Sequence, residues 1–428
     1  MRRTREDKAA WPAAWPTAWA DRALQARAGE LIDLASRLVR TPSENPPGDT
    51  RAVCDFCEDW LKDRQIAVRR LAADPAAPNL VARVTGGRPG RKLVLNGHID
   101  TYPAQDASLW RHPPFGGKIE DGRLYGRGSA DMKAGVAAIL LVTALAAESP
   151  EKAAGELVLT LASDEETMGE KGTAHLLAHA PETRGDALLS PESSGLHMMC
   201  FGQKGLLWVR LTARGRGAHG AFVHRGKNAV DSLMAALTDL RGRLDSLGPA
   251  LPPGLAPYLD AAREDPRGLL SPEDLEVLGK VTVNVGKISG GEKINLVAET
   301  CEAEVDIRLP PGALVDQVRK VLAEVFAEHP GVQGEELRAY DPTVSEPHSP
   351  IFQALRREAA AVTGAEPLPA LRIGATDARF FRAAGIPAAT YGPAGHNVGG
   401  PDEFVDLDEL VRVARVLART TFSFLGGG

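Results

Sequence analysis

Histidine and acidic residues, which can bind metal ions, stand directly after apolar segments of the chain. His98 and Asp100 end the apolar segment that begins at Leu93. Because side chains alternate along a strand, both point to the same side of the predicted sheet. The aspartate can then accept the second ring N–H of the histidine, as metal-binding histidines require. A buried histidine–aspartate pair with only a structural role would have the same spacing.

The next apolar segment, residues 156–162, also leads into acidic residues, Glu165 and Glu166. Neighbouring side chains at a strand end point in opposite directions, so one glutamate can bind metal while the other takes a proton from water. A solvated acidic loop is the alternative, and the apolar segment before it argues against this. Glu192 has a similar position after the segment that begins at Ala187.

Asp131 lies in a glycine-rich turn, residues 126–135, at the start of an apolar helix that reaches Ala147. Glycine lets the backbone approach a ligand closely, and a carboxylate is favourable at a helix start. A simple helix cap is the alternative. One imidazole among several carboxylates suits Zn²⁺, Mn²⁺ or Co²⁺, and such close carboxylates would repel one another without a cation. We therefore predict one or two divalent metal ions per subunit, about 3.5–4 Å apart if two are bound, with Asp131 between them.

Alternating strand-like and helix-like segments must position these residues. The expected strands are residues 79–84, 93–100, 156–166 and 187–194, and the expected helices follow Asp131 and lie near 170–180, 350–363 and from 407 onward. Strands separated by helices predict an α/β fold with a mostly parallel sheet and helices on both faces. Ligands of such sheets bind at the carboxyl ends of the strands, where the predicted metal ligands lie.

Residues 206–340 follow a different order: strand, helix, strand, strand, helix, strand. This βαββαβ series predicts a compact ferredoxin-like module. We therefore expect a catalytic domain made of residues 1–200 and 343–428, interrupted by a second domain of residues 201–342. Near the N-terminus, Pro12 and Pro16 interrupt a tryptophan-rich stretch, so residues 1–25 are expected to form an irregular arm.

The composition limits the partners of the protein. Its 428 residues include 50 Lys plus Arg and 56 Asp plus Glu, which gives a net charge of −6 and a pI near 6.0. This balance offers no basic surface for nucleic acid or an anionic membrane, and no segment reaches the roughly 20 apolar residues of a membrane span. We expect a small-molecule substrate. The N-terminal residues do not fit a signal peptide, and four cysteines are too few for a disulfide framework, so a cytoplasmic location is expected.

In this order, the residues described above resemble the metal-dependent peptidase and amidohydrolase family of acetylornithine deacetylase, succinyl-diaminopimelate desuccinylase, aminoacylase and the glutamate carboxypeptidases. The resemblance extends over roughly residues 30–425. It implies two metal positions, a general base and a residue that orients the first histidine. The implied roles are His98 and Glu192 on one metal, Asp131 as the bridge, Glu166 on the second metal, Glu165 as the base and Asp100 beside His98.

The inserted module resembles the lid and dimerisation domain of the same family. Ala218-His219, followed by the segment 226–229, matches a lid motif whose histidine stabilises the oxyanion in the active site of the partner subunit. The resemblance thus implies a homodimer through this domain, or a higher oligomer. Asn295 and Arg308 match positions that meet the substrate carboxylate in relatives, and Asp377 lies in a segment that resembles one near the substrate.

The C-terminal part departs from the family pattern. Relatives usually supply the last metal ligand as a histidine four residues before a glutamate, and here Gly399 stands at that distance from Glu403. The nearby histidine is His396, seven residues before Glu403. Either His396 binds metal from a rearranged loop, or the second metal site is weak or absent.

The favoured function is metal-dependent hydrolysis of a carbon–nitrogen bond, in the amide of a small N-acyl amino acid or a dipeptide, with Glu165 as general base. One alternative within the resemblance is an aminohydrolase that releases an aromatic amine, as from 5-nitroanthranilate. Another is a non-catalytic binding protein on the same fold. The presence of both Glu165 and Glu166 argues against a binding protein, because such a protein needs no general base.

Overall fold

A computed structural model describes residues 15–148, 154–247 and 251–426 of the chain. The chain divides into two compact units. The first contains residues 1–201, 345–369 and 376–428, and the second contains residues 202–344 and 370–375. The division lies close to the expected domain boundaries, except that the short segment 370–375 joins the second unit.

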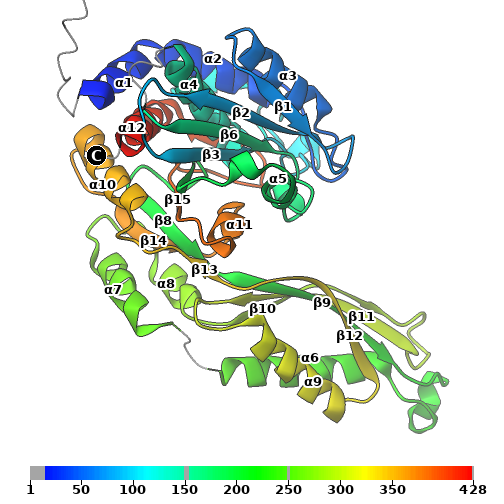
Figure 1. The fold of residues 1–428 in the computed structure, drawn as a ribbon. Helices are drawn as coiled ribbons and strands as arrows, with labels where there is room; N and C mark the ends of the chain where they lie inside the picture. Colours follow the sequence, from blue (N-terminus) through cyan, green and yellow to red (C-terminus); the bar gives the residue numbers. More distant parts are fainter. Residues whose placement is uncertain (1–14, 149–153, 248–250, 427–428) are drawn as a thin grey trace, which may run out of the picture. The chain divides into compact units, whose positions relative to one another are not determined.

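The first unit is built on a mixed sheet with the strand order β1-β2-β6-β3-β7-β15-β8 (Figure 1). Its strands are β1 (Val68–Leu71), β2 (Asn79–Thr85), β3 (Lys92–His98), β6 (Glu156–Ala162), β7 (Ala187–Ser190), β8 (Met198–Gln203) and β15 (Ala388–Thr390). The central strands β6, β3, β7 and β15 are parallel, whereas β1, β2 and β8 pair antiparallel at the two sides. The parallel centre confirms the predicted α/β class.

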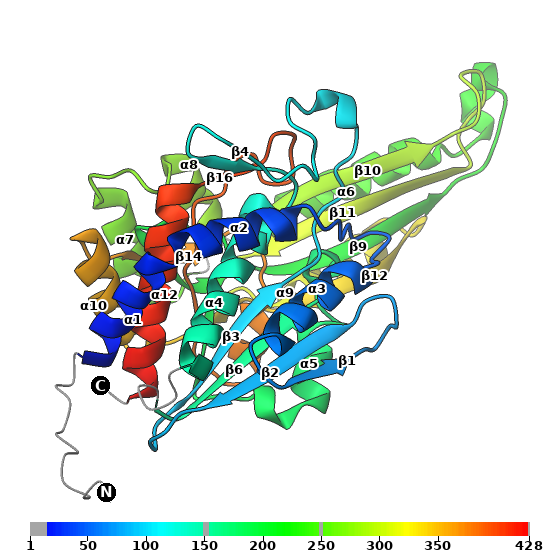
Figure 2. The same cartoon turned by 90° about the horizontal axis from the view of Figure 1, so that it is seen from above.

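Helices cover both faces of this sheet (Figures 1 and 2). One face carries α1 (Trp15–Ala26), α2 (Ala28–Val39), α3 (Arg51–Lys62), α4 (Ala134–Glu148), α10 (Pro350–Thr363) and α12 (Leu407–Leu425). The other face carries α5 (Thr173–His179) and α11 (Ala378–Ala383), where Leu176 and Phe381 share a core with Val94 and Val158 of the sheet. A small sheet of β4 (Lys118–Glu120), β5 (Arg123–Tyr125) and β16 (Phe404–Asp406) completes the unit.

The segment that contains α4, Ser129–Glu148, is long and apolar enough to cross a membrane by length and composition, with a mean hydropathy of 1.7. This differs from the sequence analysis, which expected no segment with the apolar length of a membrane span. However, 89% of its apolar window is buried inside the structure, where it packs on β3, β6, α2 and α12. An all-round apolar helix of this kind is typical of the core of a large α/β unit.

The prediction of an irregular arm for residues 1–25 is wrong from Trp15 onward, because helix α1 begins at that residue. Pro16 lies in the first turn, where its missing N–H breaks no helical hydrogen bond. Trp19 packs edge-on against Phe422 of α12, with ring centroids 5.5 Å apart. Residues 1–14 of the expected arm lie outside the described residues.

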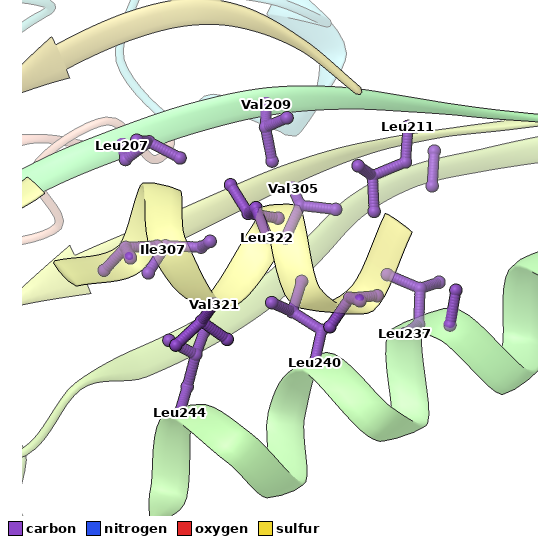
Figure 3. Close-up of a cluster of buried hydrophobic side chains, with 14 of the residues drawn as sticks. Leu207, Val209, Leu211, Leu237, Leu240, Leu244, Val305, Ile307, Val321 and Leu322 are labelled. Carbon is purple, nitrogen blue, oxygen red and sulfur yellow. The ribbon is translucent and has the colours of Figure 1, made fainter. Parts of the chain in front are cut away.

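The second unit has the predicted βαββαβ order. Its main elements are β9 (Gly205–Arg214), α6 (Ala229–Asp245), β10 (Thr282–Gly290), β11 (Thr300–Leu309), α9 (Val315–Glu328) and β12 (Val332–Tyr340). The strands form an antiparallel sheet in the order β10-β11-β9-β12. Buried side chains that alternate along β9 and β11 pack against the two helices, as Figure 3 shows for Leu207, Val209, Val305, Leu240 and Leu322.

Four further elements complete the description. The connection from α6 to β10 contains α7 (Ala256–Glu264) and α8 (Pro272–Leu278). The short strands β13 (Thr343–Val344) and β14 (Leu368–Arg372) lie where the chain passes from one unit to the other.

Candidate metal centre

His98 is the last residue of β3, and in the parallel pairing with β6 it lies opposite Ala162. Its ring is buried, with Nδ1 3.0 Å from the backbone oxygen of Asp100. Because a carbonyl oxygen can only accept, Nδ1 carries a proton, and Nε2 is the ring nitrogen that can bind a metal ion when it is deprotonated. Burial lowers the pKa of His98, but the hydrogen bonds to Asp100 and Asp131 raise it well above its usual value. Nε2 lies 3.0 Å from Oδ1 of Asp131 and 3.7 Å from Oε1 of Glu192. The imidazole therefore presents a metal-binding nitrogen to two carboxylates.

His98, Asp131 and Glu166 form a group whose ligand atoms all lie within 4.8 Å of one another. They come from three separate elements: the end of β3, the turn η2 (Ser129–Lys133) before α4, and the turn η3 (Glu165–Thr167) after β6. With Glu192 beside His98, four of the predicted metal ligands meet at the carboxyl end of the parallel strands. Their roles as ligands stay a prediction.

Glu403 holds the turn that carries Asp131. Its Oε1 accepts hydrogen bonds from the backbone N–H groups of Ala130 (2.9 Å) and Asp131 (3.2 Å). Its Oε2 accepts one from Arg127 Nη1 at 2.5 Å, and both side chains are only 1% exposed. Burial raises the pKa of Glu403, and Arg127 opposes that rise. The sequence reasoning missed this pair, since no local spacing reveals a contact between residues so far apart.

Asp100 holds the second turn. Its carboxylate accepts hydrogen bonds from the backbone N–H groups of Glu165 (3.2 Å) and Glu166 (3.1 Å), and from the side-chain amide of Asn45 (2.9 Å). The same carboxylate lies 3.4 Å from Nδ1 of His98. Asp100 therefore positions both the predicted base and a predicted metal ligand, in addition to lying beside the histidine.

Glu165 is buried and Glu166 is half-buried, and the carboxylates of both have incomplete hydrogen bonding. Oε1 of each is enclosed and has no hydrogen-bond partner in the described part of the protein. Burial raises the pKa of both groups, and the Asp131 carboxylate raises each further. The Glu166 oxygen favours a bound cation or ligand, because an unpaired buried carboxylate oxygen is costly, whereas the Glu165 oxygen lies 3.5 Å from the Arg379 guanidinium without a hydrogen bond. An imidazole nitrogen among carboxylate oxygens is a donor set that fits a divalent cation such as Zn²⁺, Mn²⁺ or Co²⁺.

Two other predicted residues of the first unit lie outside this group. His396 is exposed and stacks on Phe404, with ring centroids 4.4 Å apart and planes at 8°. Asp377 is buried, and its Oδ2 accepts a hydrogen bond from Thr173 at 2.7 Å. Burial raises the pKa of Asp377 to about 7. Metal binding by His396 and substrate contact by Asp377 stay predictions.

The predicted residues of the second unit fall into two separate places. His219 and Asn295 are exposed on adjacent loops, where the Gly220 N–H donates to the Asn295 carbonyl at 2.7 Å. Arg308 lies toward the opposite end of the β9–β11 ladder, eight residues from the Thr300 end of β11. At about 3.3 Å per residue, roughly 26 Å of strand separates the two ends. These three side chains therefore cannot meet around one small molecule within one second unit.

Comparisons with known proteins agree with this geometry. The sequence matches the peptidase family M20/M25/M40 over residues 94–422. A succinyl-diaminopimelate desuccinylase of Cereibacter sphaeroides is 32% identical over 403 residues, covering 91% of this chain and 97% of that protein. The fold is similar to an M20 metallo-carboxypeptidase of Sulfolobus solfataricus, with a TM-score of 0.78, 19% identity and coverage of 92% and 99%. It is also similar to a dinuclear metal-binding M20 peptidase of Bacillus subtilis, with a TM-score of 0.65, 14% identity and coverage of 94% and 99%.

The fold, the candidate metal centre and these similarities together define a metal-dependent hydrolase that acts on carbon–nitrogen bonds. The chain belongs to the peptidase family M20/M25/M40.

Proposed function

We propose that this protein hydrolyses the amide bond of a small N-acyl amino acid, and that N-succinylated diamino acids are the first substrates to test. One observation carries the proposal: the Glu165 carboxylate, with an oxygen that lacks a hydrogen-bond partner, adjoins the His98, Asp131 and Glu166 group. The name of the Cereibacter sphaeroides relative supports the substrate class. A dipeptide is the second substrate class in the same reaction.

Different residues of this chain would bind the metal, transfer the proton and position the base. A bound divalent cation would polarise the amide carbonyl and lower the pKa of water toward about 7. His98, Asp131, Glu166 and Glu192 would hold that cation, as one ion or two. Glu165 would take a proton from the attacking water and return it to the leaving amine, so that the carboxylate is regenerated after each turnover. Asp100 would keep the turn formed by residues 165–168, named the glutamate turn here, in place by accepting hydrogen bonds from the Glu165 and Glu166 N–H groups.

A homodimer would complete the site. We propose that His219 and Asn295 serve the site of the partner subunit, as the resemblance of the Ala218-His219 segment to a lid motif implies, and that Arg308 serves a different site of the dimer, because the two places lie about 26 Å apart along one sheet. The test mixes E165Q and H219A subunits, which are each expected to keep about 1% of wild-type activity or less when assayed alone. A mixed dimer then has one site with both residues intact, and a 1:1 mixture is expected to regain about a quarter of wild-type activity. A mixture without any recovered activity would contradict the shared site.

The deciding experiment is a hydrolysis panel with metal control. The protein is stripped with a chelator, reloaded with Zn²⁺, Mn²⁺ or Co²⁺, and assayed on acetylornithine, succinyl-diaminopimelate, dipeptides, N-acyl aromatic amines and 5-nitroanthranilate. Metal-dependent turnover of an N-acyl amino acid is expected. Turnover of 5-nitroanthranilate alone would assign the protein to aromatic amine hydrolysis. Tight binding of a panel compound without any turnover would identify a binding protein.

The four cysteines are all free and buried, and burial raises the pKa of the Cys54 thiol to about 12. Such thiols need no disulfide partner, so we propose that the protein works in the reducing cytoplasm.

A further inference from the structure

Arg379, near the start of α11, connects three parts of the first unit around Glu165. Its side chain is only 3% exposed. Nη1 donates to the backbone oxygen of Thr376 at 2.8 Å, and Nη2 donates to the backbone oxygen of Met168 at 2.7 Å. Nη1 also lies 3.5 Å from Oε1 of Glu165. A buried guanidinium is therefore fixed by two carbonyl groups while it faces the predicted base.

The Met168 carbonyl belongs to the residue that ends the glutamate turn. The Met168 N–H donates to the backbone oxygen of Glu165 at 2.8 Å, and Met168 has a left-handed conformation with a φ of +80°. Arg379 thus contacts both the last backbone carbonyl of the turn and the carboxylate of its first residue. Asp100 holds the same turn from the other side, through the N–H groups of Glu165 and Glu166.

We propose that Arg379 is a positioning residue that fixes the Glu165 carboxylate for proton transfer; this inference rests on the proposed function. A planar guanidinium has five N–H donors in a fixed arrangement, so it can bind two carbonyl groups and face a carboxylate at once. Lysine has one compact ammonium group on a flexible stem and cannot meet all three. A displacement of the base by about 1 Å would lower the rate about 10²-fold.

Arg382 provides a matched control from the same helix. It is also a buried arginine, and its Nε and Nη2 donate to the backbone oxygen of Ala388 at 3.2 and 3.1 Å. Ala388 lies in β15, away from the glutamate turn. Replacing Arg382 therefore removes a comparable buried cation and its carbonyl contacts while the partners of Glu165 remain in place.

The experiment compares R379M, R379K and R382M with the wild type in the metal-loaded enzyme. We expect R379M and R379K to lower kcat about 10²-fold, with KM and bound metal within about threefold of the wild type. R382M is expected to keep kcat within about threefold. If R379M and R379K both have the same kcat as the wild type, the proposal is overturned. If R379M does not fold, as judged by circular dichroism, R379K alone decides the question.

A double variant and crystal structures separate this inference from the proposed function. Because Arg379 acts through Glu165, R379M should cause no further loss when added to E165Q. An equal additional loss would overturn the positioning role. If E165Q retains wild-type activity, the proposed function fails instead. Crystal structures of wild type and R379K then test the geometry without activity: a displaced Glu165 carboxylate is expected, and an unchanged one refutes the proposal.

Discussion

The first unit buries several charged side chains, whereas in the described part of the second unit the buried charged residue is Lys204. The interior of the first contains ionisable groups, including the Arg127–Glu403 pair, Lys133 and Glu165. The core cluster of the second, between its sheet and its helices, consists almost entirely of leucine, valine, isoleucine and alanine, while His219 and Asn295 are exposed on loops. In the first unit, the residues proposed to act in catalysis are among these buried ionisable groups, so changing them should also alter stability. In the second, the candidate functional residues lie outside the core, so changing them should leave the fold intact.

The largest effect is expected for E165Q. Loss of the general base should lower kcat about 10⁴-fold, near the upper limit for general acid–base catalysis. Burial and the nearby Asp131 carboxylate disfavour the charged form of Glu165, so glutamine should give the metal-free variant a higher Tm than the metal-free wild type, although Arg379 then loses its ion-pair partner. Steady-state kinetics and thermal melts measure both. A Tm of metal-free E165Q below that of the metal-free wild type would contradict the idea that the negative charge of Glu165 destabilises the metal-free site.

The next effect is expected for H219A in the second unit. Loss of an oxyanion donor should lower kcat about 10²-fold. Because His219 is exposed, Tm and bound metal should not change. H329A, which removes a histidine that contacts Asp239 in the same unit, is the control and should keep wild-type kinetics. A large fall in the Tm of H219A would contradict the idea that the candidate functional residues of the second unit can be changed without loss of stability.

A smaller effect on metal binding is expected for E403Q. The variant leaves the buried Arg127 guanidinium without its counter-charge and weakens the support of the Asp131 turn. We expect about a 10- to 100-fold loss of metal affinity, as for other residues that support metal ligands, together with a lower Tm. Calorimetric metal titration measures the affinity. An unchanged affinity would show that the turn keeps Asp131 in place without Glu403.

The smallest effect is a change in pH dependence. Burial raises the pKa of Asp377 to about 7, so between about pH 4 and 7 the folded state binds a proton that the unfolded state has released. This contribution to stability is present below about pH 4 and is lost as the pH rises to about 7. In the metal-free protein, D377N should therefore flatten the decline of the unfolding free energy over this range. E366Q, at an exposed position, should leave the slope unchanged.

The sequence predicted those parts of the molecule that depend on local periodicity. Apolar segments gave β3, β6 and the strands of the second unit, and the acidic residues after β6 identified the Glu165–Glu166 turn. α1 was missed because proline was taken to break the helix, although Pro16 lies in its first turn. The roles of Glu403 and Arg379 could not be predicted, because both contact the site across large sequence separations and their burial follows only from the complete fold.

The link between Glu403 and the Asp131 turn has a consequence for protein synthesis. The turn leaves the ribosome long before Glu403, which follows Asp131 by 272 residues. While the chain is still being made, the His98 strand and the Asp131 turn exist without the carboxylate and the C-terminal helices that hold them. A nascent chain that has not yet exposed Glu403 therefore lacks the hydrogen bonds that support the Asp131 turn, and we expect the proposed metal site to bind metal weakly before that point.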